Sequence, residues 1–262
     1  MTEPLHEVAF TEEEVLAILD QCGSDSLLVG GQALAIWATL FRVARPVELS
    51  VAISSDLDFL ARASSARALK ESLKDWTLWI TRPDDHSVNT AKLTQRVGKS
   101  GVKQIDFLSS IQGLSTEAIR RRGVPITLKS GKTILVLHPL DVLESRLQNL
   151  SSLPVKRNVE GIAQARLAIS IANRFINQLI ADREPVRTVW DAIGRVSDIA
   201  TNKRLTRVFV EFELYILAAI PADHVAYEAF QTKRWPQLKA EFAKLIGTYR
   251  KQISRAIPLT RR

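Results

Sequence analysis

The amino-acid sequence predicts an α/β (α+β) protein with two domains: a mixed sheet with flanking helices over residues 1–150, then a helical domain over residues 151–262. Three observations predict this organisation. Short β-rich runs alternate with helical segments in the first part, whereas the second part has only long segments of helical periodicity. The length of 262 residues suits one large domain or two modest ones.

The elements expected in the first part follow from apolar runs and turn residues. The apolar run Ser26–Val29 meets Gly30-Gly31, and helical composition follows over Gln32–Phe41. The other elements expected here are strands over Leu49–Leu60, Thr77–Thr81 and Gln104–Leu108, helices over Ser64–Asp75 and Thr116–Arg122, and a hairpin of Ile126–Leu128 with Thr133–Leu137.

The elements expected in the second part are all helical. A helix over Asp141–Leu150 follows His138-Pro139, a favourable helix start, so the domains should meet near residues 138–158. Four longer apolar-periodic segments separated by prolines come next, at about Glu160–Ala181, Pro185–Ala200, Leu205–Ile220 and Pro236–Ile253.

Composition places the chain among globular proteins and excludes several kinds of site. Apolar residues make up 46% and charged residues 24%. The single cysteine, Cys22, cannot form an internal disulfide, and the four histidines lack zinc-ligand spacing. The acidic N-terminus has no apolar signal segment, and no apolar run is long enough to span a membrane. We therefore expect a cytoplasmic protein.

Charge is divided unevenly along the chain. Residues 1–150 contain 17 Lys and Arg against 18 Asp and Glu, whereas residues 151–262 contain 19 against 10. The basic second part predicts an anionic partner, for which nucleic acid is the obvious candidate. The alternative is that the excess charge only keeps the protein soluble.

The pattern that most clearly suggests a functional site is Asp56-Leu57-Asp58. Residues at i and i+2 of a strand point to the same face, roughly 6.5–7 Å apart along the backbone. Two carboxylates on one face repel each other unless a cation lies between them, and such oxygen ligands suit Mg²⁺ or Mn²⁺. Alone, the pattern is weak, because a solvated strand end has the same composition.

Two further features strengthen that interpretation. Gly30-Gly31 stands between an apolar run and a helix, where backbone amides can approach a phosphate; a tight turn is the alternative. Asp106 lies inside an apolar strand and is followed by Phe-Leu, as Asp58 is. A buried unpaired carboxylate is costly, so Asp106 is either a third metal ligand or part of a salt bridge, with Lys103 or Arg122 as the candidate partner.

Together, these features resemble the DNA-polymerase-β-like nucleotidyltransferase superfamily. The segments LLVGGQALAIWA and SDLDFLA look most like the branch of AbiEii/AbiGii toxin-type nucleotidyltransferases. The resemblance covers roughly residues 25–150 and implies a nucleotidyltransferase-type sheet. It also implies NTP as substrate, Mg²⁺ or Mn²⁺ as cofactor, and a toxin role with a possible antitoxin partner.

The resemblance implies a role for each acid. Asp56 and Asp58 are expected to bind two metal ions, and Asp106 to hold the ion on the nucleophile side. In-line displacement at a phosphorus atom is then clamped by the two metals. The expected phosphate contacts are Gly30, Gly31 and Ser55.

The sequence departs from the family pattern in places. The 24 residues between Gly31 and Asp56 require an insertion near Arg42–Glu48. Arg146 stands where the toxin-type enzymes have a lysine and is an expected nucleotide contact, since arginine can still bind phosphate. Their downstream acid has no clear counterpart, Glu160 being nearest. Further cations expected along the triphosphate channel, or else merely solvated, are Lys92, Arg96, Lys99 and Lys103.

The leading hypothesis is therefore an enzyme that transfers a nucleoside monophosphate from an NTP to a hydroxyl of RNA, such as tRNA, or of a protein. One rival is a non-catalytic nucleotidyltransferase-fold module that binds nucleic acid or a partner. The other is an enzyme that modifies a small molecule such as an antibiotic. The basic second part favours a polyanionic acceptor over a small one.

Overall fold

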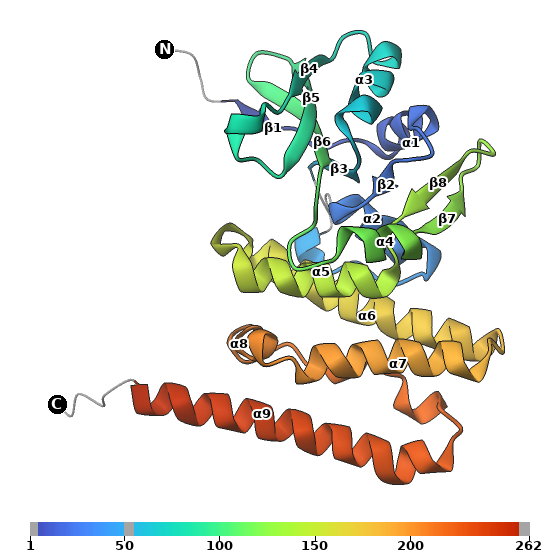
Figure 1. The fold of residues 1–262 in the computed structure, drawn as a ribbon, viewed down its shortest axis with the longest axis vertical. Coiled ribbons are helices and arrows are strands. Elements are labelled where there is room, and N and C mark those ends of the chain that lie inside the picture. The colour runs from blue at the N-terminus through green and yellow to red at the C-terminus, as the bar shows by residue number, and fades with distance from the viewer. Residues whose placement is uncertain (1–4, 50–54, 257–262) are drawn as a thin grey trace. The chain divides into compact units, whose positions relative to one another are not determined.

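The computed structural model describes residues 5–49 and 55–256, which form two compact units (Figure 1). The sheet unit comprises the described residues up to Thr39 and those from Arg45 to Ser145. The helical unit comprises Leu40–Ala44 and the described residues from Arg146 onward. The predicted boundary at residue 150 lies inside helix α5 (Pro139–Ser152), a few residues after the boundary that the structure has.

Within the described residues, the sheet unit contains one mixed sheet of eight strands. Its order is β4-β5-β6-β3-β2-β8-β7, and β1 pairs with β6. The strands are β1 (His6–Glu7), β2 (Leu27–Leu28), β3 (Leu57–Leu60), β4 (Thr77–Ile80), β5 (Asn89–Val97), β6 (Gly101–Leu108), β7 (Val124–Thr127) and β8 (Thr133–Val136). This sheet with its helices confirms the mixed α/β class that the sequence predicts.

Four further helices belong wholly or largely to the sheet unit. Helix α1, which the sequence analysis missed, begins with a capping box in which Thr11 and Glu14 bond each other's backbone amides. Helix α2 is tied to β8 because the indole of Trp37 donates to the carbonyl of Leu137 at 2.7 Å. The four are α1 (Glu12–Gln21), α2 (Gly30–Leu40), α3 (Ala63–Ser72) and α4 (Thr116–Arg122).

The central strands β3 and β6 place their apolar side chains on one face. They run parallel, with Leu57 opposite Ile105 and Phe59 opposite Phe107, and all four are buried. The rings of Phe59 and Phe107 stack with centroids 5.7 Å apart. Because side chains alternate along a strand, the residues between these apolar ones point to the opposite face.

The predicted strand over Leu49–Leu60 is shorter in the structure. Leu49 ends a 3₁₀ turn (Val47–Leu49), residues 50–54 lie outside the described residues, and β3 begins only at Leu57. Strand β5 was not predicted, and β6 is longer than expected because it begins at Gly101 rather than Gln104.

The helical unit contains α6 (Val159–Ala181), α7 (Val186–Thr201), α8 (Thr206–Glu211) and α9 (Trp235–Ala256). The predicted helix over Leu205–Ile220 is wrong. Helix α8 ends at Glu211, and Glu213 takes a left-handed conformation with φ 51°, which a continuous helix does not allow. A 3₁₀ turn over Ile216–Ala219 follows. Among the described residues, no helix is long and apolar enough to cross a membrane.

Candidate functional site

Asp58 and Asp106 occupy opposite positions on the parallel strands β3 and β6. Neighbouring strands lie about 4.8 Å apart, and opposite residues point to the same face. The two carboxylates therefore share the face opposite Phe59 and Phe107. We call it the acidic face, after these two residues.

Gly30 packs directly against Asp58. The amide of Val29 donates to the carbonyl of Asp58 at 2.9 Å, so the turn from β2 into α2 is tied to β3. A Cβ atom built on Gly30 would lie 2.8 Å from Cγ of Asp58 and closer still to Oδ2. Gly30 also has φ +66°, which favours glycine. The start of α2, where the amides of a first helical turn have no acceptor within the helix, therefore lies beside the Asp58 carboxylate.

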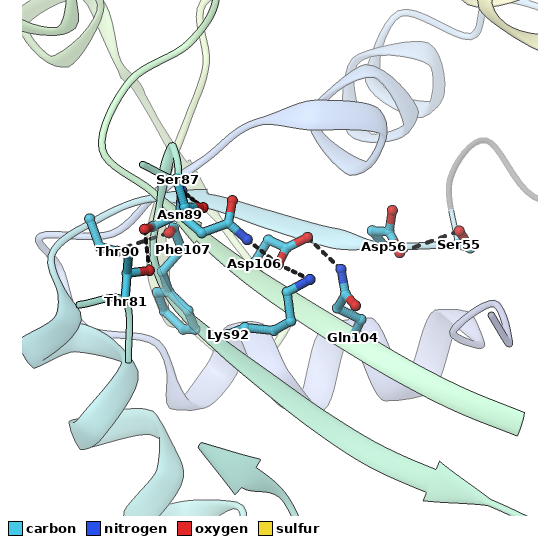
Figure 2. A network of polar contacts seen from close by, with 10 residues as sticks. All are labelled: Ser55, Asp56, Thr81, Ser87, Asn89, Thr90, Lys92, Gln104, Asp106 and Phe107. Carbon is cyan, nitrogen blue, oxygen red and sulfur yellow. Dashed lines mark hydrogen bonds and ion pairs between the residues drawn. The ribbon is translucent and has the colours of Figure 1, made fainter. Parts of the chain in front are cut away.

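Three side chains converge on the Asp106 carboxylate (Figure 2). Asn89 donates to Oδ1 at 2.8 Å and Gln104 donates to Oδ2 at 2.7 Å. The ammonium of Lys92 lies 3.5 Å from Oδ1. Asp106 thus has a salt bridge, as one interpretation of this buried acid required, but its partner is Lys92. Arg122, one of the two partners considered, instead pairs with another buried acid of the sheet unit.

The row that contains Asp58 and Asp106 continues across β5 and β4. Lys92 is opposite Asp106, and Trp79 is opposite Lys92. Trp79 is 44% exposed, so its indole is accessible to a ligand on this face. The sequence analysis had no reason to single out Trp79, because its signal is the cross-strand register.

Asp56 and Ser55 lie immediately before β3, where the described chain resumes (Figure 2). The hydroxyl of Ser55 donates to the carboxylate of Glu7 at 2.9 Å and lies 3.4 Å from Oδ1 of Asp56. Glu7 is opposite Val102 on β6, and Val102 shares its face with Asp106. Glu7 is therefore a further acid beside the predicted site, which the sequence analysis did not identify.

Lys103, one of the predicted phosphate contacts, lies on the other face of the sheet. Its ammonium bonds to Glu14 of α1 and lies 5.7 Å from the ring centroid of Phe10. The hydrogen bond from Lys103 holds the pKa of Glu14 below its usual value. Because neighbouring residues of a strand point to opposite faces, Lys103 cannot join Asp106, and we leave it out of the proposed site.

Arg146, the other predicted phosphate contact outside the acidic motifs, belongs to the helical unit. Its guanidinium donates to Gln164 of α6 at 2.9 Å, and both side chains are buried. Gln164 in turn donates to Glu160 at 3.3 Å. Gln164 thus links the buried Arg146 to the exposed Glu160.

The acidic face fits a hard cation only in part. Asp58 lies beside Asp106, and carboxylate oxygens are the ligands that Mg²⁺ prefers. Over the described part of the chain, however, no group of three or more His, Cys, Asp or Glu side chains is arranged to hold a metal ion. Mg²⁺ is usually held by one or two carboxylates together with water and substrate phosphates, so the present side chains fit an ion that arrives with its phosphates.

Comparison with models of known protein families and with curated proteins finds no match to this chain. The site must therefore be argued from its own residues.

We predict that Gly30→Ala destabilises the protein by roughly 3 kcal/mol or more, since a left-handed alanine costs about 1–2 kcal/mol and overpacking about 1–3 kcal/mol. Urea unfolding measures the change. Gly98→Ala is the matched control, because Gly98 also has a positive φ, +62°, but nothing lies within 4 Å of its Cβ position. We expect Gly98→Ala to cost only about 1 kcal/mol.

The double variant Gly30→Ala/Asp58→Ala identifies the source of the cost. Removing the carboxylate should recover part of the stability lost in Gly30→Ala, a coupling that only residues in contact show. If the two substitutions are additive, or if Gly30→Ala costs no more than Gly98→Ala, the close approach of Gly30 to Asp58 is not present in solution.

Proposed function

We propose that the chain is a metal-dependent nucleotidyltransferase that moves a nucleoside monophosphate from an NTP to a hydroxyl of an acceptor. The observation that carries the proposal is the contact between the start of α2, at Gly30, and the carboxylate of Asp58, which is opposite Asp106. A helix start favours anions, and the acid beside it gives a cation a place to bind next to those anions. A nucleotidyltransferase-type layout of the sheet is part of this proposal.

The charges at this place favour a metal–phosphate complex over phosphate alone. A triphosphate that approaches the start of α2 meets Asp58 and, farther along, Asp106, and like charges repel at such distances. A divalent cation between them offsets the repulsion. Asp56 and Asp58 are the proposed ligands of Mg²⁺ or Mn²⁺, as the i, i+2 spacing predicts.

Asp106 is the proposed third acid of this set. Lys92 is the most distant of its three partners, so Lys92 is the one that a cation at Oδ1 would replace. When bound, the metal lowers the charge on the transferred phosphoryl group and makes the acceptor hydroxyl more acidic. The residues of the chain position the triphosphate: Gly30 and Gly31 by backbone amides, and Lys92 by its charge.

Trp79 is the proposed contact for the nucleobase. It stands in the same cross-strand row as Lys92 and Asp106, on the edge strand β4, with nearly half of its surface exposed. Base stacking on an aromatic ring is tolerant of base identity, so Trp79 supplies affinity rather than a choice among NTPs.

In the proposed reaction, the acceptor oxygen forms a bond to the α-phosphorus and the bond to the β,γ-pyrophosphate breaks. The products are an acceptor that carries the NMP, pyrophosphate and the proton of the hydroxyl. RNA is the favoured acceptor, because residues 151–262 have 19 Lys and Arg against 10 Asp and Glu. A protein acceptor, a toxin role and an antitoxin partner remain part of the proposal through the family resemblance alone.

A non-catalytic binding module is the second candidate, and one observation favours it. Asp106 is already paired with Lys92 and accepts hydrogen bonds from the amides of Asn89 and Gln104. A module of this kind binds the nucleotide or nucleic acid without transferring NMP, so the two candidates differ in one measurable product.

We predict that the protein, incubated with each α-labelled NTP, Mg²⁺ and total RNA, transfers label to the RNA. Asp58→Asn keeps the shape of the side chain but removes a charge, and it should lower the transfer by more than about 100-fold, a loss typical when a group that stabilises transition-state charge is removed. The melting temperature should stay near that of the wild type.

Asp75→Asn is the control for a charge lost elsewhere in the sheet unit, because Asp75 is exposed in the turn between α3 and β4. It should transfer label as the wild type does. If the wild type labels neither RNA nor protein, while still binding NTP, the binding module is the better account.

We also predict that Trp79→Ala raises the KM for the NTP by roughly 5- to 100-fold, the equivalent of one lost base stack. Trp79→Phe keeps an aromatic ring and should recover most of the affinity. Steady-state kinetics at several NTP concentrations separate this effect from one on kcat. A change of kcat alone would show that Trp79 does not bind the base.

A further inference from the structure

Two pockets that share a lining residue lie in the helical unit, and their described lining includes no residue of the proposed site. The larger pocket has a volume of about 620 Å³. It is lined by residues 42–44, by α6 and by the turns that follow α8. The smaller has a volume of about 270 Å³ and is lined mainly by the end of α6 and the start of α7. His224 lines both. The larger volume is in the range of small-molecule sites.

The larger pocket is cationic. Arg42 and Arg174 line it, and no Asp or Glu is among its described lining residues. Neither guanidinium makes a hydrogen bond or ion pair with another described residue. Two arginines that face the same space without a carboxylate favour an anionic ligand, and the planar guanidinium suits phosphate.

One wall of the larger pocket is held by a chain of side-chain hydrogen bonds. Asn173 donates to the carbonyl of Ala218 at 2.9 Å and accepts from Asn177 at 2.9 Å. The side chain of Asn177 also bonds Nδ1 of His224. Because these groups already satisfy one another, the wall is organised before any ligand arrives, which lowers the entropy cost of binding.

Arg42 is held in place by its neighbour and has an unusual backbone. The rings of Phe41 and Phe175 pack with centroids 6.3 Å apart, which fixes the segment on α6. Arg42 itself has φ 51°, a left-handed conformation that is uncommon for a residue with a side chain. Such conformations cluster at ligand sites, where the surrounding structure maintains them.

The smaller pocket is apolar and aromatic. The ring centroids of Trp190 and Tyr227 lie 5.3 Å apart, and Tyr227 is 47% exposed. Ile180, Val186 and Val189 complete this wall. Arg183 and Glu184 also line the smaller pocket, so its charged side chains offset each other, and its apolar and aromatic wall suits a neutral ring.

We propose that the helical unit binds a nucleotide, with its phosphate between Arg42 and Arg174 and its base against Tyr227 and Trp190. His224, which lines both pockets, lies where the sugar joins the two. The same chemistry is presented by a free nucleotide and by a nucleotide of single-stranded RNA. The excess of basic residues in this part of the chain favours RNA. This site goes beyond the proposed transferase function and does not depend on it.

The test is a binding experiment without NTP and with EDTA, so that metal at the acidic face contributes nothing. Fluorescence anisotropy measures binding of a labelled single-stranded RNA hexamer, and calorimetry measures binding of AMP. We expect the hexamer to bind, with an affinity that falls steeply as salt rises. Asp58→Asn, which impairs only the acidic face, should leave this affinity unchanged.

Matched variants distinguish a built site from diffuse charge. Arg174→Gln should weaken hexamer binding by about tenfold, the usual scale for a lost charge-assisted contact, whereas Arg166→Gln, two turns earlier on α6 and outside both pockets, should change it by less than about twofold. Tyr227→Leu should weaken binding by at least about fivefold, and the exposed Tyr215→Leu by less than about twofold.

Each outcome decides the proposal. Binding of the hexamer but not of AMP, with loss in Arg174→Gln and Tyr227→Leu, supports the site and identifies the strand as its ligand. Binding of AMP with the same losses supports the site with a free nucleotide as its ligand. No binding of either, or equal losses in Arg166→Gln and Arg174→Gln, overturns it.

Discussion

The approach of Gly30 to Asp58 is the constraint on which the proposed site depends. The backbone bond from Val29 to Asp58 sets the β2–α2 turn beside β3, and no side chain larger than hydrogen fits at Gly30. The first turn of α2 is thereby directed at a carboxylate. Because β3 pairs in parallel with β6, the same contact also brings the helix start near Asp106.

The two acids of the acidic face have different surroundings, and this difference gives the site its expected chemistry. Lys92, Asn89 and Gln104 hold the Asp106 carboxylate, so its buried charge is not left unpaired. Asp58 instead lies against the start of α2, where the dipole of the helix favours negative charge. A phosphate drawn to the same helix start competes with Asp58 unless a divalent cation joins them. The arrangement therefore favours a metal–nucleotide complex over either component alone.

The sequence predicted those features that depend on short-range patterns. Alternation of polar and apolar residues placed Asp58 and Asp106 on strands, and the glycine pair marked the start of α2. The same alternation also separates Lys103 from Asp106, because the two are three residues apart on β6. Trp79 could not be found in this way, because its place beside Lys92 and Asp106 depends on the register across β4, β5 and β6. The helix over Leu205–Ile220 was overextended because its apolar periodicity continues past Glu213, whose left-handed backbone ends it.

The central claim is that the acidic face binds a nucleotide through a divalent metal. Calorimetry with an NTP whose α,β-bridging oxygen is replaced by CH₂ tests it without any transfer. We expect the wild type to bind this analogue at least about tenfold more tightly with Mg²⁺ than with EDTA, as mass action on a metal-dependent complex requires. Asp58→Asn should bind it weakly in both conditions. Equal affinity with Mg²⁺ and with EDTA in the wild type would contradict the account.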